Sequence, residues 1–134
     1  EQVLETNRDT VRIVFKNMPL RFHKFADPSA RAALAAGMQG KFWEFHDALF
    51  ASEQLNDQVI SEIAVKLGLD MARFNQDMNS PAIRQRIAKD LRDAQLAGVT
   101  GTPTVFINGR KLKNRSLQGF QALINAELGK QPTP

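Results

Sequence analysis

Only a few residues of this 134-residue sequence could do chemistry, and the most reactive kind is missing. The chain has no cysteine, which excludes thiol nucleophiles, thiolate zinc sites, disulfides and redox chemistry by its own side chains. The two histidines are His23 and His46. Asp47 follows His46, but neighbouring helix residues point to different faces, so the two are expected to make a poor dyad. We interpret both histidines as structural or surface residues and expect no metal site and no cofactor.

Asp90 and Asp93 share a segment with helical periodicity and could be read as a pair of carboxylates for acid–base work. Arg86 and Lys89 each precede one of them by four residues, which is the spacing of oppositely charged partners on a helix. The arrangement therefore predicts ion pairs on an exposed helical face rather than catalysis.

The formal net charge is +4, and the basic residues are scattered except for Arg110, Lys111, Lys113 and Arg115. This basic segment could contact an anion, but no aromatic residues alternate with its cations, so no nucleic-acid partner is expected. The apolar share of 43% and the charged share of 24% are typical of a globular domain. No apolar stretch approaches the roughly 18 residues of a membrane span, so none is expected.

The dipeptide Thr102-Pro103 follows Gly101 in a segment that also contains Gly98. Proline is the only residue at which a cis peptide bond costs little, about 0.5–1 kcal/mol. A cis bond would turn the backbone of Thr102 outward, where its amide and carbonyl could pair with an extended peptide. A trans proline at the start of a strand is the alternative that the pattern leaves open.

Three segments have the residue pattern of β-strands. Residues 11–16 are rich in β-branched side chains, and Pro19 ends them. Residues 104–107 and 110–113 flank an Asn-Gly pair, which is the strongest short signal for a β-hairpin. The three strands are expected to share one sheet.

The other segments have the periodicity and the capping residues of helices. Residues 1–10 have the pattern of a helix end, and further helices are expected to begin near residues 27, 40, 56, 70, 80 and 116. Asp27 before Pro28 is expected to cap the first of these. The aromatic group of the next helix is expected to pack in the core against the sheet; it comprises Phe42, Trp43, Phe45 and Phe50.

Three stretches together resemble the DsbA-like branch of the thioredoxin superfamily: MPLRFH at 18–23, QGKFWEFHDALF at 39–50 and GVTGTPTVFINGRKL at 98–112. The resemblance implies a helix-rich α/β thioredoxin-like fold, with residues 1–134 as a single domain and a helical insertion at 27–97. It also implies a cis-proline at Pro103 and substrate binding by Gly101, Thr102 and Pro103. Trp43 is expected near an apolar groove below that proline.

The sequence departs from this family at its start. In the family an opening strand leads into a CxxC motif at the first helix, and this sequence begins after that point. The domain is therefore expected to be N-terminally truncated and incomplete, with no catalytic residue. The absent strand would lie centrally, so we expect a homodimer that fills the gap or a rearranged sheet.

Two functional hypotheses follow. In the first, the chain is a fragment or variant of a DsbA-like thiol–disulfide oxidoreductase, a family that oxidises or isomerises protein disulfides, and is itself redox-inactive. In the second, it is a cysteine-free thioredoxin-fold module that binds peptides or partner proteins. The resemblance implies unfolded or disulfide-containing proteins as substrates and a periplasmic or other extracytoplasmic compartment.

Overall fold

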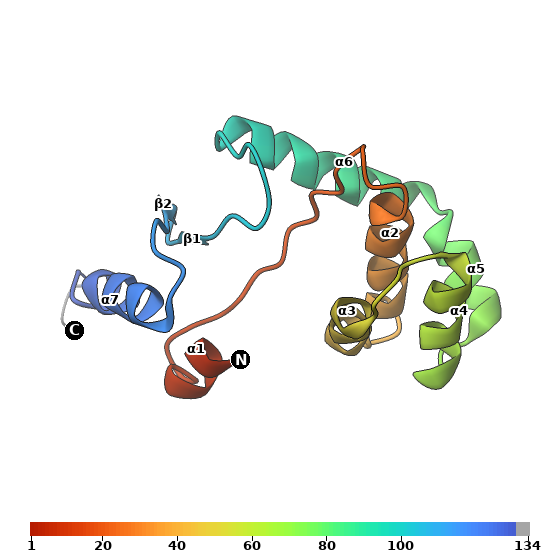
Figure 1. Ribbon diagram of the computed structural model, residues 1–134, viewed down its shortest axis with the longest axis horizontal. Helices are drawn as coiled ribbons and strands as arrows, with labels where there is room; N and C mark the ends of the chain where they lie inside the picture. The colour runs from red at the N-terminus through yellow and green to blue at the C-terminus, as the bar shows by residue number, and fades with distance from the viewer. Residues whose placement is uncertain (131–134) are drawn as a thin grey trace. The chain divides into compact units, whose positions relative to one another are not determined.

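The computed structural model describes residues 1–130, and the chain divides into two compact units (Figure 1). The sheet unit comprises Glu1–Phe15 together with the chain from Val99 onward, and the helical unit comprises Lys16–Gly98. The predicted insertion, residues 27–97, lies within the helical unit. No helix within residues 1–130 is long and apolar enough to cross a membrane.

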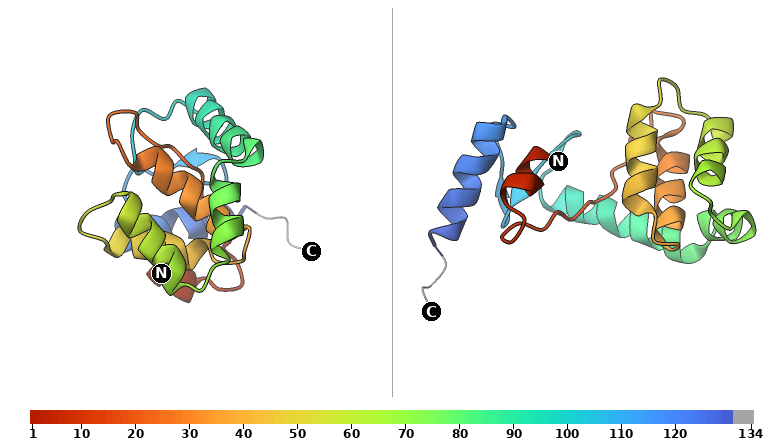
Figure 2. Two further views of the ribbon diagram at one scale, coloured as in Figure 1. Left: turned by 90° about the vertical axis from the view of Figure 1, so that its right-hand side faces the viewer. Right: turned by 90° about the horizontal axis from the view of Figure 1, so that it is seen from below.

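The helical unit is built from five helices (Figure 2), and each predicted helix of this region is present. They are α2 (Ala26–Gly37), α3 (Phe42–Ala51), α4 (Asp57–Lys66), α5 (Met71–Met78) and α6 (Pro81–Leu96). The side-chain oxygens of Asn56, Asp70 and Ser80 accept backbone N–H groups in the first turns of α4, α5 and α6. These caps satisfy amides that have no partner within the helix, which is why these three helices begin where the sequence predicts.

The start of α2 differs from the prediction. The helix is capped at Phe25 without a side-chain hydrogen bond, so Asp27 is not the capping residue. Asp27 lies in the first turn, where its carboxylate accepts a hydrogen bond of 2.8 Å from Nε of Arg31. A carboxylate in this turn still interacts favourably with the positive end of the helix dipole.

Helix α2 contacts α3, α4, α5 and α6 and forms the centre of the helical unit. Its buried face is made of alanines, whose small side chains let the neighbouring helices approach closely: Ala32, Ala33, Ala35 and Ala36. Beside them the rings of Phe45 from α3 and Phe74 from α5 meet with centroids 5.8 Å apart. The core of this unit therefore combines the alanine face of α2 and two buried aromatic rings with buried aliphatic side chains from the rest of the unit: Ile60, Ile63, Leu69, Ile83 and Ile87.

The predicted aromatic core of α3 is wrong for two of its four members. Phe45 is fully buried and Phe42 half-buried, but Trp43 is 46% exposed and Phe50 78% exposed. With 3.6 residues per turn, positions two before and five after Phe45 lie on the opposite side of the helix. Only one face of α3 packs into the core of the helical unit, and Phe45 lies on that face. Trp43 and Phe50 therefore point away from the core.

The sheet unit contains α1 (Gln2–Thr6), β1 (Phe106–Ile107), β2 (Arg110–Lys111) and α7 (Leu117–Leu128). Ser116 caps α7 by accepting the N–H of Gly119 at 3.1 Å, as the sequence predicts. The side-chain amides of Asn7 and Gln121 exchange hydrogen bonds of 2.9 and 3.0 Å. This reciprocal pair joins the end of α1 to α7.

The predicted hairpin is present, with a shorter ladder than expected. Its antiparallel register pairs Phe106 with Lys111 and Ile107 with Arg110. The turn residues Asn108 (φ 47) and Gly109 (φ 77) both lie in the left-handed region that a two-residue hairpin turn requires. Beyond the ladder, N–H of Leu112 donates to the carbonyl of Val105 at 2.9 Å.

The strand predicted at residues 11–16 is not formed, and residues 11–20 have no helix or strand. In the described part of the chain the sheet consists of β1 and β2 alone, so the prediction of three strands in one sheet is wrong as well. β-Branched residues favour an extended backbone, but a strand also needs a neighbour whose backbone groups pair with it. Val14, in this segment, is 60% exposed.

Candidate functional site

The loop that leads into β1 contains the three residues predicted to bind substrate, and all of them belong to the sheet unit. Thr102 and Pro103 are exposed, and Gly101 is half-buried. The peptide bond between Thr102 and Pro103 is cis. A Cβ atom added at Gly101 would meet nothing within 4 Å, so the loop lies open on that side.

Two side chains fix the loop on either side of Thr102. The hydroxyl of Thr104 donates to the carbonyl of Gly101 at 2.7 Å. Nη1 of Arg115 donates to the carbonyl of Pro103 at 3.0 Å. The backbone N–H and C=O of Thr102 itself make no hydrogen bond with any residue in 1–130. The loop thus offers one donor and one acceptor at a position whose flanks are held in place.

The strand that follows has one edge without a strand partner in residues 1–130. In an antiparallel pair, successive residues direct their N–H and C=O groups alternately toward the partner strand and away from it. Val105 faces β2, because its carbonyl accepts the N–H of Leu112. Thr104 and Phe106 therefore direct their backbone groups to the open edge. Thr102 precedes this edge along the chain, so loop and edge together could pair with an extended backbone.

Helix α7 covers one face of the hairpin. Arg110 of β2 reaches Glu127 of α7, with Nη1 2.8 Å from Oε1, and Lys130 donates to the same oxygen at 2.9 Å. These hydrogen bonds lower the pKa of Glu127 below its ordinary value. The bond from Arg110 has the largest effect and the bond from Lys130 the next largest. The bond from Arg110 also holds the hairpin against α7.

Trp43, predicted near a groove below Pro103, lies on α3 in the helical unit. Its ring is edge-on to Phe42 and His46, with centroid distances of 5.1 and 5.3 Å. The groove itself stays a prediction.

The expectation that His46 and Asp47 face apart is wrong. Nδ1 of His46 lies 3.0 Å from Oδ1 of Asp47. Sequence spacing fixes the directions in which two side chains leave a helix, but rotation about their bonds can still bring the polar ends together. The Asp47 side chain is 67% exposed, so the contact is a surface interaction of small energy.

The prediction that Asp90 lies on an exposed helical face is wrong. Its side chain is buried, and the residue is only 1% exposed. Its Oδ2 accepts hydrogen bonds of 2.9 Å from both the backbone N–H and the side-chain amide of Asn17. The predicted partner Arg86 is present, with Nε 3.4 Å from Oδ1. Asp90 follows Ile83 and Ile87 at helical spacing on the buried stripe of α6, and that spacing is the signal that could have revealed its burial.

Asp93 lies one turn further along α6 and also has its predicted partner. Lys89 donates to its Oδ2 at 2.7 Å, and Lys16 donates to the same oxygen at 2.8 Å. The hydrogen bonds from Lys16 and Lys89 lower the pKa of Asp93 to about 2. The two aspartates thus anchor the segment at Lys16 and Asn17 to α6 and do not form an acid–base site.

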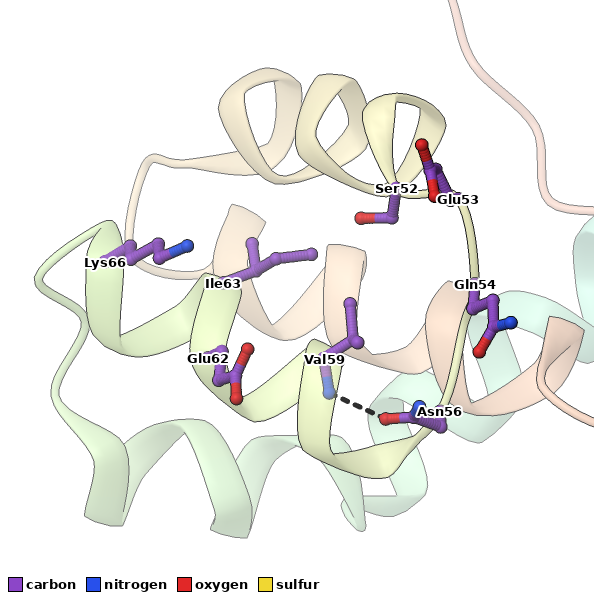
Figure 3. Close-up of a pocket in the computed structure, with 8 residues that line it drawn as sticks. All are labelled: Ser52, Glu53, Gln54, Asn56, Val59, Glu62, Ile63 and Lys66. Carbon is purple, nitrogen blue, oxygen red and sulfur yellow. Dashed lines mark hydrogen bonds between the residues drawn. The ribbon is translucent and has the colours of Figure 1, made fainter.

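A hollow of about 390 Å³ lies between the end of α3 and α4 (Figure 3). Its wall mixes polar and apolar side chains: Ser52, Glu53, Gln54, Asn56, Val59, Glu62, Ile63 and Lys66. The Ser52 hydroxyl donates to the carbonyl of Ala48, and Asn56 caps α4 through Val59. Its polar groups are therefore partly committed to local structure, and residues 1–130 contain no cluster of three potential metal ligands here or elsewhere.

Comparison with known proteins defines the class of this domain. Residues 2–125 match the family described as the DSBA-like thioredoxin domain, and the chain belongs to this family. A crystal structure of a thioredoxin-like oxidoreductase from Silicibacter pomeroyi DSS-3 superposes with a TM-score of 0.84 and 29% sequence identity. The match covers 97% of this chain and 75% of that one. The predicted DsbA-like thioredoxin fold class is confirmed, with a smaller sheet than expected.

The curated relatives are much longer proteins that are named as Na(+)/H(+) antiporters. The chain is 41% identical over 110 residues to the Na(+)/H(+) antiporter NhaA 1 of Salinispora arenicola, covering 81% of this chain and 17% of that protein. It is 38% identical over 106 residues to the Na(+)/H(+) antiporter NhaA of Herminiimonas arsenicoxydans, covering 78% of this chain and 17% of that protein. The similarity therefore concerns a small part of each antiporter.

Proposed function

We propose that this domain binds an extended polypeptide along Thr102 and the open edge of β1, as the substrate-binding part of a DsbA-like thiol–disulfide oxidoreductase. The observation that carries the proposal is the exposed Thr102, whose backbone N–H and C=O have no partner in residues 1–130. The bonds from Thr104 and Arg115 hold the loop around it. A site fixed before binding loses little entropy when a ligand arrives.

Recognition at this site is made by the backbone. Hydrogen bonds to main-chain groups give affinity for any extended segment, whatever its sequence. Such a site suits unfolded or disulfide-containing proteins as substrates, because an unfolded chain presents free backbone groups. Pro103 carries no N–H, and its carbonyl is already bonded to Arg115, so Thr102 supplies the donor and the acceptor.

Thiol–disulfide exchange requires attack by a thiolate on a disulfide sulfur. The sequence has no cysteine, so this chain cannot supply that thiolate. Its part in the reaction is to hold the substrate, and the reactive thiols must come from outside this sequence. By itself the chain is redox-inactive.

A second candidate is a cysteine-free module that binds a partner protein without any redox step. It is favoured by the curated relatives, which are named as antiporters rather than oxidoreductases. The occupant of the same edge would then be a segment of a partner protein. For either candidate the family resemblance implies a periplasmic or other extracytoplasmic compartment, which we include in the proposal.

The test is fluorescence anisotropy with a labelled, unstructured peptide and a series of versions that each carry one N-methylated amide. Because a paired strand uses alternate backbone groups, methylation should weaken binding at every second position. Loss of one hydrogen bond should reduce affinity about two- to tenfold. Absence of binding, or equal affinity for all methylated peptides, would exclude the proposed mode.

The same assay separates the two candidates. A peptide with an internal disulfide is compared with its serine counterpart of equal length. Tighter binding of the disulfide peptide favours the oxidoreductase role, and equal binding favours the partner-binding module.

A further inference from the structure

The hairpin and the segment after it are strongly basic. Val99–Pro134 contains five cations and one carboxylate, Glu127, and that carboxylate is bonded to Arg110 and Lys130. Lys111 and Lys113 are exposed, and their side chains make no ion pair or hydrogen bond with any residue in 1–130. This part of the sheet unit therefore has positive charge that the described chain does not neutralise.

Strand geometry places part of this charge on the face of the hairpin opposite α7. Arg110 reaches the α7 residue Glu127, and Leu112 is buried at 7% exposure. Successive side chains of a strand point to opposite faces, so Lys111 lies on the other face with its cross-strand neighbour Phe106. Phe106 is 38% exposed. That face offers a cation beside an apolar ring.

Arg115 brings a further cation to the proposed binding loop itself. Its Nη1 lies 3.0 Å from the carbonyl oxygen of Pro103, the residue after Thr102. A guanidinium has five N–H donors, and this hydrogen bond uses one of them. A polypeptide paired with Thr102 would therefore pass close to a fixed positive charge. At physiological salt such a charge acts over about 8 Å, which is the scale of a few peptide residues.

We propose that this site selects extended peptides that carry acidic side chains next to the residue paired with Thr102, and that Lys111, Lys113 and Arg115 make the selection. The inference rests on the proposed function and names the class of substrate or partner that it would take. A peptide is favoured over a nucleic acid because the open edge offers backbone groups in strand geometry. Phe106 is the cross-strand neighbour of Lys111, but no aromatic residue lies between Arg110 and Arg115, whereas nucleic-acid sites interleave several aromatic residues with their cations.

The test compares two labelled peptides of equal length and equal apolar content, one with glutamates and one with lysines flanking the same core. Their affinities are measured by anisotropy for the wild-type chain and for Lys111→Glu/Lys113→Glu, at low and at physiological salt. The matched control is Lys24→Glu/Lys66→Glu, which makes the same charge change at two exposed lysines of the helical unit. Circular dichroism verifies that each variant is folded.

The wild-type chain should bind the acidic peptide about three- to tenfold more tightly than the basic one, and salt should reduce the difference. The hairpin variant should lose or reverse this preference, and the control should keep it. Equal affinity for the two peptides, with the N-methyl alternation intact, overturns the charge selection but leaves the proposed function standing. If neither peptide binds, both fail. Tighter binding of a single-stranded oligonucleotide than of the acidic peptide would also overturn the inference.

Discussion

At the scale of single residues, Asp90 shows how a charged side chain can hold a fold together. Its carboxylate is 1% exposed and accepts two hydrogen bonds from Asn17, while Oδ1 has Arg86 at 3.4 Å. A buried charge is tolerated only when donors surround it, so each donor that is removed leaves part of the desolvation cost uncompensated.

Asn17→Ala should lower the free energy of unfolding by about 1–3 kcal/mol, because Asp90 loses the hydrogen bond from the Asn17 side-chain amide and keeps only the one from the backbone N–H of residue 17. The matched control is Asn75→Ala at an exposed helical asparagine, which should change stability by less than about 0.5 kcal/mol. Urea denaturation of both variants measures the difference. Equal stability of the two variants would contradict the anchoring role of Asn17.

Asp93 should make stability depend on pH in the acid range. Hydrogen bonds from Lys16 and Lys89 lower its pKa from the ordinary 3.8 to about 2, so the folded state favours the ionised form. This contribution is complete well above pH 3.8 and is lost as the pH falls toward about 2. In Asp93→Asn the free energy of unfolding should fall less steeply through this window, and in Lys89→Met the change should be intermediate. If the free energy of unfolding of Asp93→Asn fell as steeply with pH as that of the wild-type chain, the role of Asp93 in acid stability would be contradicted.

Residue patterns indicated the loop at 101–103, where we propose that a polypeptide binds, but they missed the contacts that anchor Lys16 and Asn17 to α6. Gly98, Gly101 and Pro103 mark a stretch of unusual backbone directly, because the conformational limits of glycine and proline are local. The contact between Asp90 and Asn17 joins residues 73 positions apart, and charge spacing along one helix contains no information about it. The contact between His46 and Asp47 depends on side-chain rotation, which spacing does not determine either.

At the scale of elements, the start of α7 depends on a residue without a side chain. A Cβ atom at Gly119 would collide with the backbone carbonyl of Asn114, which cannot easily move. At Gly129, after the end of α7, an added Cβ would lie 3.5 Å from the carbonyl oxygen of Asn125, an ordinary contact. The two glycines therefore differ sharply in what they tolerate.

Gly119→Ala should destabilise the chain by about 1–3 kcal/mol, despite the higher helix propensity of alanine. Gly129→Ala should be close to neutral. Thermal or chemical unfolding followed by circular dichroism gives both values. Comparable stability of the two variants would show that the turn before α7 adjusts freely.

Elements with their own capping signals were predictable, and the element that needs a distant partner was not. Asn56, Asp70, Ser80 and Ser116 each bond to amides a few residues away, so the sequence marks these helix starts. The segment at 11–16 has strand-forming residues, but the described sheet offers it no neighbour. Its propensity could therefore not decide its structure.

At the scale of the whole molecule, the exposed apolar residues of this segment bear on self-association. Ile13 is 45% exposed and Val14 60% exposed, in a stretch that belongs to neither helix nor strand. Exposed apolar residues of this kind favour association with another chain.

We expect a homodimer in light scattering across a concentration series. Val14→Lys should weaken the association, because a charge on this segment opposes its burial. Val65→Lys is the matched control, since Val65 on α4 is 61% exposed. A monomer at all concentrations, or equal weakening by both variants, would contradict association through this segment.

The fold class was predictable because three stretches of sequence carry the DsbA-like pattern in order along the chain. The extent of the sheet was not, because strand pairing depends on segments distant in sequence. The role of Trp43 likewise depends on the placement of a helix far from Pro103 along the chain, which residue patterns do not contain.

The most direct test of the central claim is an amide proton–nitrogen correlation spectrum of the chain, titrated with the acidic peptide. If the backbone of Thr102 and the edge of β1 bind the peptide, the amide signals of Thr102 and Thr104 should shift most, with Phe106 next. Shifts confined to the helical unit, with the Thr102 and Thr104 signals unchanged at saturation, would contradict the account.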